Sequence, residues 1–200
     1  MPDELPLDGG ANGLIIPSPN GHLVRKKMRR NAIGNPIDIQ MTIHRIAQQI
    51  LRDENNFTTL RAPYLQAQAA AAGGGSHPNG EEYWMERIDT SNPLWLGDQD
   101  SVNCYSQNLI DDVKQELVRF WLQMWARGYA AWDFELYVQR DNTVVILDFD
   151  KYARRSVNSP ELFRMPYRVN VPPERFFTHI CFPPEFAEQV GNPFRTNSLP

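Results

Sequence analysis

Two stretches of the chain carry apolar residues at helical spacing. In residues 106–128 these residues recur every three or four positions and would line one helix face: Leu109, Val113, Leu117, Phe120, Trp121 and Met124. Ser106 or Asn108 can cap the start of this helix, and Gly128 is typical of its end. A second stripe predicts a helix over residues 37–53, with apolar residues at Ile39, Ile43, Ile46, Ile50 and Leu51.

Runs of aromatic and β-branched residues predict strands elsewhere. Residues 134–138 and 143–147 are two such runs, and the turn residues Asp141 and Asn142 between them predict a hairpin. Shorter runs predict strands over residues 14–16, 22–27 and 82–88, and one around Leu60. Strands and helices mixed in this order are typical of an α+β protein.

Three regions lack such a pattern. Residues 66–80, rich in alanine and glycine, predict an exposed flexible loop, and residues 89–105 predict an irregular connector. The Pro-rich and aromatic stretch after residue 151 predicts a tail with one short helix over 183–190 and a disordered end over 191–200.

Composition limits the classes of protein that fit. A content of 42% hydrophobic and 11% aromatic residues supports a single packed domain, and a net charge of −4 argues against a general nucleic-acid binder. Two cysteines far apart predict neither a disulfide framework nor a zinc site. No apolar run approaches the roughly 20 residues of a membrane helix, and the N-terminus does not resemble a signal peptide. We therefore expect a soluble, intracellular protein, cytoplasmic or nuclear.

Two carboxylates, Asp133 and Asp148, stand at the open end of the predicted 134–147 hairpin, and we expect them to converge there. Glu135 and Asp150 are further candidates nearby. Clustered carboxylates usually need a cation, and Mg²⁺ fits because it takes oxygen ligands from one or two carboxylates. The alternative is that Asp148 and Asp150 are solvated turn residues with Lys151 as a surface partner.

The segments GYAAWD (128–133) and VILDFD (145–150) resemble the catalytic loop and metal loop of the protein-kinase-like superfamily. The resemblance implies that Asp133 orients the acceptor hydroxyl and that Asp148 binds the Mg²⁺ of an ATP–Mg²⁺ complex. Glu135 stands where that family has its metal-binding asparagine. Ala131-Trp132 replaces the family's His-Arg, and Asp150 replaces its glycine.

The N-terminal half resembles the same family. Gly10 and Gly13 match two glycines of the loop that covers the nucleotide phosphates, and the strand over 22–27 supplies Lys26 as the phosphate-binding lysine. On this resemblance Met85 faces the nucleotide base, and backbone groups near Glu86 to Ile88 bind adenine. A basic solvated face over residues 25–30 is the alternative reading of the lysine strand.

The helix over 37–53 would take the place of the family's regulatory helix. That helix normally offers a glutamate to the strand lysine, whereas the inward-facing candidates here are His44, Ala47 and Gln48. We expect His44 to be an ordinary packed or surface histidine.

Together these features predict an α+β, two-lobed, protein-kinase-like fold, with a small β-rich lobe over residues 1–88 and a truncated, mainly helical lobe over residues 89–200. Three hypotheses remain: an ATP/Mg²⁺-dependent phosphotransferase, a catalytically inactive kinase-like scaffold for a nucleotide or protein, and a metal-dependent nuclease-like cluster. The Asp-x-x-Lys spacing and the acidic chain disfavour the third. The acceptor, a protein substrate or partner, and the oligomeric state stay open.

Overall fold

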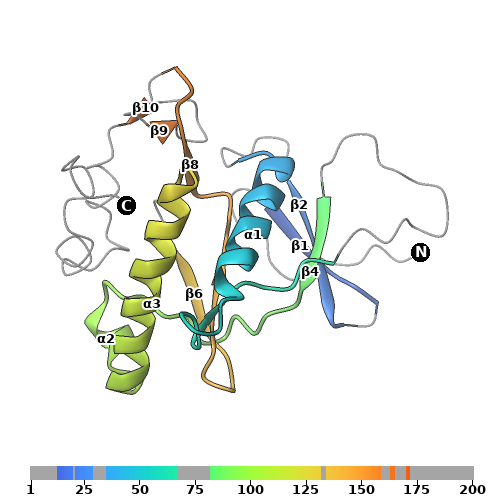
Figure 1. The fold of residues 1–200 in the computed structure, drawn as a ribbon. Helices are drawn as coiled ribbons and strands as arrows, with labels where there is room; N and C mark the ends of the chain where they lie inside the picture. Colours follow the sequence, from blue (N-terminus) through green and yellow to red (C-terminus); the bar gives the residue numbers. More distant parts are fainter. Residues whose placement is uncertain are drawn as a thin grey trace, which may run out of the picture.

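The described residues form an α+β structure of three helices and ten strands (Figure 1). The computed structural model describes residues 13–19, 21–28, 35–66, 82–131, 134–158, 163–164 and 170–171. In chain order the elements are β1 (Gly13–Pro17), β2 (Leu23–Met28), α1 (Ile37–Leu51), β3 (Leu60–Arg61), β4 (Glu82–Glu86), α2 (Gln99–Val102), α3 (Gln107–Ala126), β5 (Tyr129–Ala131), β6 (Glu135–Val138), β7 (Val144–Leu147), β8 (Tyr152–Arg155), β9 (Phe163–Arg164) and β10 (Asn170–Val171).

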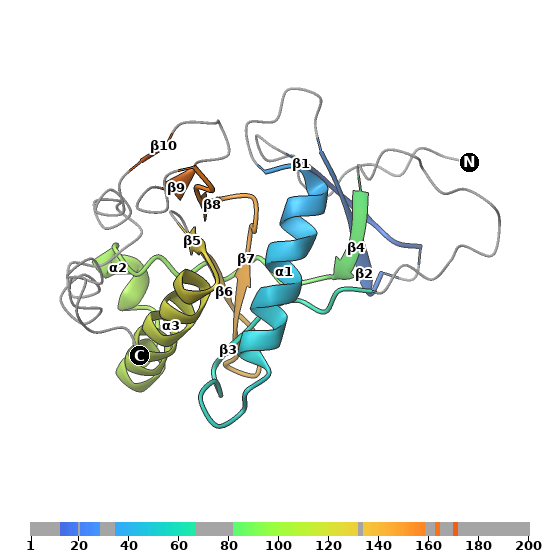
Figure 2. The same ribbon diagram turned by 45° about the horizontal axis from the view of Figure 1, so that its top comes forward.

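The strands make three small sheets. One is the antiparallel sheet β1–β2–β4, the second joins the β6–β7 hairpin to β3, which runs parallel to β7, and the third has the order β10–β9–β8–β5. Helix α1 lies between the β1–β2–β4 sheet and α3, and it contacts both β4 and α3 (Figures 1 and 2). The predicted α+β class is therefore confirmed.

Helix α3 supplies the largest part of the core. Its apolar stripe is buried from Val113 to Met124 and partly buried at Leu109, and a second tryptophan, Trp125, joins it in a stacked pair with Trp121, with ring centroids 4.9 Å apart. Full burial of an apolar side chain such as Leu117 or Phe120 contributes roughly 1.5–3 kcal/mol to the free energy of unfolding. The backbone N–H of Leu109 donates to Ser106 Oγ, so Ser106 is the cap, and Gly128, at φ +81°, follows the last turn. The predicted helix and both its ends are confirmed.

Helix α1 ends at Leu51, two positions before the predicted end at residue 53. Its inner face is apolar except for two fully buried polar side chains, Gln40 and His44. Gln40 Nε2 donates to the Asn35 carbonyl at 2.6 Å. A buried amide of this kind needs such a partner, because an unsatisfied one costs about 1–3 kcal/mol.

Strand β3 is positioned by a side chain from α3. The buried carboxylate of Glu116 accepts hydrogen bonds from the backbone N–H groups of Thr58, Thr59 and Leu60, at 2.7–3.1 Å, and from the Thr58 hydroxyl. Leu60 then pairs with Val144 of β7. The strand predicted around Leu60 exists, but its parallel partner was not predicted.

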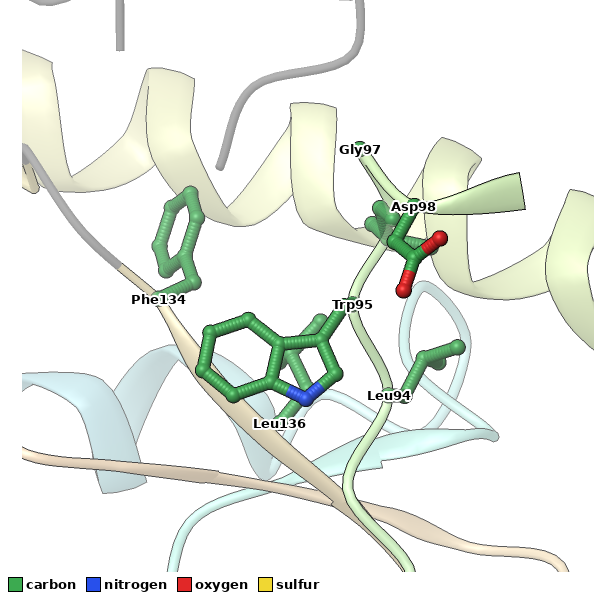
Figure 3. Close-up of a pocket in the computed structure, with 7 residues that line it drawn as sticks. Leu94, Trp95, Gly97, Asp98, Phe134 and Leu136 are labelled. Carbon is green, nitrogen blue, oxygen red and sulfur yellow. The ribbon is translucent and has the colours of Figure 1, made fainter. Parts of the chain in front are cut away.

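The connector over residues 89–105 packs along β6. The N–H of Leu94 donates to the Leu136 carbonyl, and the N–H of Val138 donates to the Asn92 carbonyl, both at 2.9 Å. Leu94 is buried, whereas Trp95 is half exposed beside a pocket of about 240 Å³ that Phe134 and Leu136 also line (Figure 3). The connector also contains the short helix α2, which the sequence pattern did not predict.

Several expectations lie outside the described residues: those for Gly10, Asp133, most of the 66–80 loop, the helix over 183–190 and the end of the chain. Strands β5 and β8, which pair with each other and bracket the β6–β7 hairpin, were not predicted. Within the described ranges, no helix combines the length and the apolar character needed to span a membrane.

Candidate functional site

A cavity of about 1150 Å³ opens between the β1–β2–β4 sheet and the β6–β7 hairpin. The sheet contributes Gly13 and Lys26, and the hairpin with its following turn contributes Glu135 and Asp148. Met85, Glu86 and Ile88 line the same cavity at the end of β4. This volume is of the size that proteins use for cofactors and small ligands. All the predicted site residues that the structure describes therefore border one cavity.

Lys26 and Asp148 form an ion pair across the cavity. Lys26 Nζ donates to Asp148 Oδ1 at 2.9 Å, although the two residues are 122 positions apart. Only 8% of the Lys26 side chain and 19% of the Asp148 side chain are exposed. Lys27, the next residue on β2, is exposed, because alternate residues of a strand face opposite sides. The interpretation of Lys26 as part of a solvated basic face is wrong.

The surroundings keep both members of this pair charged. Burial alone would raise the pKa of Asp148, but the charge of Lys26, hydrogen bonds with Asp150 and Lys26, and the charge of Lys151 together outweigh burial and hold the pKa well below its usual range. Burial alone would lower the pKa of Lys26, and the facing acidic groups Tyr83, Asp148 and Asp150 raise it above its usual value. At neutral pH the Tyr83 phenol is uncharged, because burial raises its pKa further, so the aspartates supply this stabilisation.

A second lysine, Lys151, bridges two carboxylates at the same place. Its Nζ lies 3.2 Å from Glu135 Oε1 and 3.4 Å from Asp148 Oδ2. Burial first, and then the charge of Asp148, raise the pKa of Glu135, while Lys151 opposes this rise. Lys151 is thus a partner of Asp148, as the alternative interpretation had it, but the group is largely buried and not a solvated turn.

The turn that follows β7 sets the direction of the Asp148 and Lys151 side chains. Asp148 has φ +62°, a left-handed conformation that aspartate tolerates better than most residues. Asp150, which is 1% exposed, lies within the turn. Asn35, just before α1, donates from Nδ2 to the carbonyls of Asp150 and Tyr152 at 3.1 and 2.7 Å. The solvated-turn interpretation of Asp150 is therefore wrong, and α1 is tied directly to the turn.

The donor set is compatible with a magnesium ion. In the part of the chain that the structure describes, no three His, Cys, Asp or Glu side chains gather as a metal centre, so Glu135 and Asp148 would be two protein ligands. Mg²⁺ is commonly held by one or two carboxylates, with water and phosphate oxygens completing its octahedral shell. The Lys151 ammonium now stands between these same two carboxylates.

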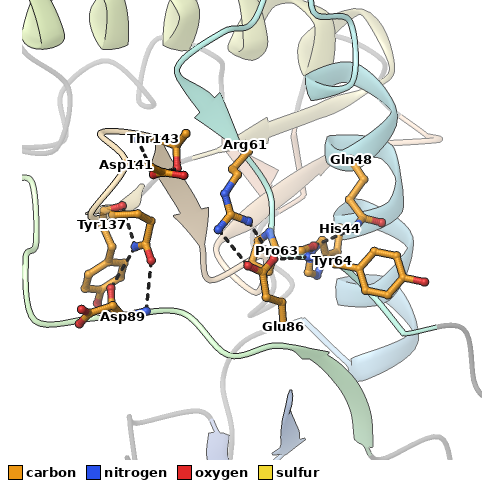
Figure 4. Close-up of polar contacts among 11 residues, drawn as sticks. His44, Gln48, Arg61, Pro63, Tyr64, Glu86, Asp89, Tyr137, Asp141 and Thr143 are labelled. Atoms are coloured by element: carbon orange, nitrogen blue, oxygen red, sulfur yellow. Dashed lines mark hydrogen bonds and ion pairs between the residues drawn. The ribbon is translucent and has the colours of Figure 1, made fainter. Parts of the chain in front are cut away.

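At the edge of the cavity, where β4 ends, some of the backbone N–H groups already donate hydrogen bonds within the protein. The N–H of Glu86 donates to the Tyr64 carbonyl at 2.8 Å, and the N–H of Arg87 donates to the His22 carbonyl at 3.0 Å. The Glu86 carboxylate holds Arg61 through two hydrogen bonds of 2.8 and 2.9 Å (Figure 4). Among residues 86–88, Ile88 alone has an N–H without a hydrogen bond to the described residues. Of the N–H groups expected to bind a base, those of Glu86 and Arg87 are therefore already used within the protein, and the expectation for this segment stays a prediction.

Helix α1 offers no carboxylate to Lys26, as the sequence predicted. Gln40 and His44 occupy its buried face, whereas Gln48 is half-buried and, with His44, contacts the Pro63 carbonyl (Figure 4). Tyr83, which lines the cavity beside Lys26, was not predicted. The sequence contained the information needed to predict it. Tyr83 and Met85 are two positions apart on one strand, so their side chains face the same side of the sheet.

The comparisons with known proteins give no family for this chain. No protein-family model matches it, and no curated protein sequence matches it significantly. The geometry of the cavity therefore carries the functional interpretation.

Proposed function

We propose that this protein is an ATP/Mg²⁺-dependent phosphotransferase of the protein-kinase-like type. The observation that carries this proposal is the buried Lys26 ammonium, which faces a cavity of about 1150 Å³ and meets Asp148 from the opposite wall. A fixed ammonium beside a carboxylate that suits a metal is the pairing that phosphoryl transfer uses to hold phosphates.

The order of elements supports a kinase-like two-lobed fold. Helix α3 is followed by β5, by residues 132–133, by the β6–β7 hairpin and by the turn of Asp148. The β1–β2–β4 sheet with α1 would form the smaller lobe, over residues 1–88. The cavity between that sheet and the β6–β7 hairpin would then be the nucleotide cleft between two lobes.

The chain's own residues would divide the work as follows. Lys26 would bind the phosphates as a point charge. Gly13 lies beside it on β1, where an added Cβ would be tight against the Lys27 carbonyl oxygen, at 3.3 Å. Met85 would contact the base, whose edge would bond to the Ile88 N–H. Glu135 and Asp148 would hold Mg²⁺, which supplies charge neutralisation of the phosphates when bound. Asp133 would orient the acceptor hydroxyl.

A second candidate is a nucleotide-binding scaffold without turnover. Two observations favour it: α1 presents Gln40 and His44 in place of a carboxylate partner for Lys26, and the Lys151 ammonium lies between the two proposed metal ligands. Both candidates require nucleotide binding, and only the first also requires transfer of the γ-phosphate.

Thermal unfolding with and without ATP tests the binding shared by both candidates. ATP at a hundredfold excess over its dissociation constant adds about 2.7 kcal/mol, which raises Tm by roughly 5 °C or more in a chain of this size. We expect this shift in the wild type and in Lys27→Met, whose lysine is exposed on the same strand. Lys26→Met should lose it. No shift in the wild type, or an unchanged shift in Lys26→Met, contradicts the proposal.

Release or transfer of the γ-phosphate separates the two candidates. An active enzyme should lose transfer in Asp148→Asn, a substitution that keeps the left-handed backbone of residue 148 without strain. Asp112→Asn, on the exposed face of α3, is the matched control and should keep the wild-type rate. An ATP-dependent Tm shift with no transfer in the wild type assigns the scaffold.

A further inference from the structure

A tight turn over residues 148–151 directs the Lys151 side chain towards the cavity. The Lys151 backbone N–H donates to the Asp148 carbonyl at 3.3 Å, which folds residues 148–151 back on themselves. Glu135 is brought to the same point by the sheet, since it pairs in register with Leu147, the residue before Asp148. The Lys151 ammonium therefore reaches both carboxylates at once, at 3.2 and 3.4 Å.

The charged groups of Lys26, Lys151, Glu135 and Asp148 pair with one another, and the buried Asp150 adds a further acidic group beside Lys26 and Asp148. Asp148 presents Oδ1 to Lys26 and Oδ2 to Lys151, and Glu135 presents Oε1 to Lys151. Two ammonium groups thus face these two carboxylates in a site where at most 30% of any of the four side chains is exposed. Largely buried charges need such partners.

A divalent ion and this ammonium compete for one position. Mg²⁺ requires carboxylate oxygens at about 2.0–2.1 Å in octahedral geometry. An ion at that distance from Glu135 Oε1 and Asp148 Oδ2 would lie close to Lys151 Nζ, which is 3.2 and 3.4 Å from the same two atoms, and the two like charges would repel each other. Because Lys151 is tethered to the turn, its ammonium is present at a high effective concentration.

We propose that Lys151 acts as an internal cation that takes the place of Mg²⁺ between Glu135 and Asp148, so that nucleotide binds to this cavity without a divalent metal. This inference rests on the proposed nucleotide-binding function and adds a residue that sets its metal requirement. Lys26 and Lys151 then provide the positive charge for the phosphates. Entry of the metal, which transfer requires, demands that Lys151 leave the two carboxylates.

Binding of Mn²⁺ alone tests the competition without nucleotide. Electron paramagnetic resonance measures free Mn²⁺, a hard ion that prefers the same oxygen ligands. We expect Lys151→Met to bind Mn²⁺ on the order of tenfold more tightly than the wild type, since the competing charge is gone. The control Lys27→Met should match the wild type. Lys151→Met combined with Glu135→Gln should lose the gain, because one of the two ligands is neutralised.

The metal dependence of ATP binding gives a second readout. In the wild type, ATP should raise Tm in EDTA as much as in Mg²⁺. In Lys151→Met, and in Lys151→Gln if the methionine variant does not fold, the shift should become dependent on Mg²⁺.

Each result decides the matter in one direction. Equal Mn²⁺ binding by wild type and Lys151→Met, or a wild-type ATP shift that needs Mg²⁺, overturns the role of Lys151 and leaves the proposed function standing. No ATP shift with or without Mg²⁺ overturns the proposed function itself, and metal-free nucleotide binding falls with it. The wild-type arms do not depend on the folding of any variant.

Discussion

The imidazole of His44 stacks on the phenyl ring of Phe149, with ring centroids 4.3 Å apart and ring planes inclined by 24°. His44 comes from the middle of α1, and Phe149 follows Asp148 in the turn, so this stack joins the helix to the candidate site. His44 Nε2 lies 2.8 Å from the Pro63 carbonyl and must donate to it, while Nδ1 is buried. The expectation of a packed histidine is therefore the correct one, and the packing reaches the Asp148 turn.

Acid should destabilise the protein through His44. Burial, and to a lesser extent the Lys26 charge, lower the pKa of His44 from 6.5 to about 3. The unfolded chain therefore binds a proton between pH 6.5 and 3 that the folded protein excludes, and stability falls as pH decreases through this window. From pH 7 to pH 5 the loss should be about 2 kcal/mol, measured from urea unfolding curves.

The variant His44→Phe isolates this effect. Phenylalanine keeps the stack on Phe149 without titrating, and Pro63 retains the hydrogen bond that Gln48 Nε2 donates at 2.7 Å. Its stability should change by about 2 kcal/mol less than that of the wild type between pH 7 and pH 5. The variant His22→Gln, at an exposed position, should follow the wild type. Equal pH dependence in His44→Phe and wild type would contradict the assignment.

Neutralising Glu116 should loosen β3. In Glu116→Gln one carboxylate oxygen becomes an amide that cannot accept, which leaves at least one buried N–H of residues 58–60 without its acceptor. We expect a loss of about 2 kcal/mol in the free energy of unfolding, from urea titration followed by circular dichroism. Glu54→Gln makes the same change at an exposed position and should cost less than about 0.5 kcal/mol. Similar costs for the two variants would exclude a special role for Glu116.

Removing Lys26 should cost stability as well as nucleotide binding. In Lys26→Met the Asp148 carboxylate loses its 2.9 Å partner and keeps the ion pair with Lys151, at 3.4 Å. Breaking a buried pair on one side costs about 3–5 kcal/mol, and the remaining partner should bring the loss to about 3 kcal/mol. Denaturant unfolding of this variant beside Lys27→Met measures the difference. A cost below about 1 kcal/mol would mean that the pair is effectively solvated.

Gly128 should be sensitive to a side chain because of its backbone. At φ +81°, Gly128→Ala introduces strain of about 1 kcal/mol, while the new Cβ would lie in ordinary contact, 3.5 Å from Arg155 Cβ. Asparagine tolerates the left-handed region better, so Gly128→Asn should lose less stability than Gly128→Ala. Thermal unfolding of the two variants ranks them, and the reverse order would refute the backbone explanation.

The long helices and the β6–β7 hairpin were predictable because their signals are local. The apolar stripes of residues 37–51 and 107–126, and the turn at Asp141 and Asn142, require no knowledge of the rest of the chain. The choice of Lys26 over Lys27 came from the resemblance, and the structure places Lys26 inside.

The remaining elements depend on distant partners. Strand β3 is two residues long and is held by Glu116, more than 50 positions away. Strands β5 and β8 have alanines at their pairing centre, Ala130 opposite Ala153, which carry little strand propensity. The double contact of Lys151 needs the register of Glu135 with Leu147, which the sequence alone does not specify.

The parallel pairing of Leu60 with Val144 has a consequence for synthesis of the chain on the ribosome. Strand β3 cannot acquire its native partner until the segment near residue 144 has emerged, because the strand that receives it is made more than eighty residues later. Such distant contacts slow folding, since a long loop must close before they form. Likewise, the apolar face of α1 that packs against α3 stays exposed during translation until α3 has been synthesised. A chaperone would bind the nascent protein in this interval.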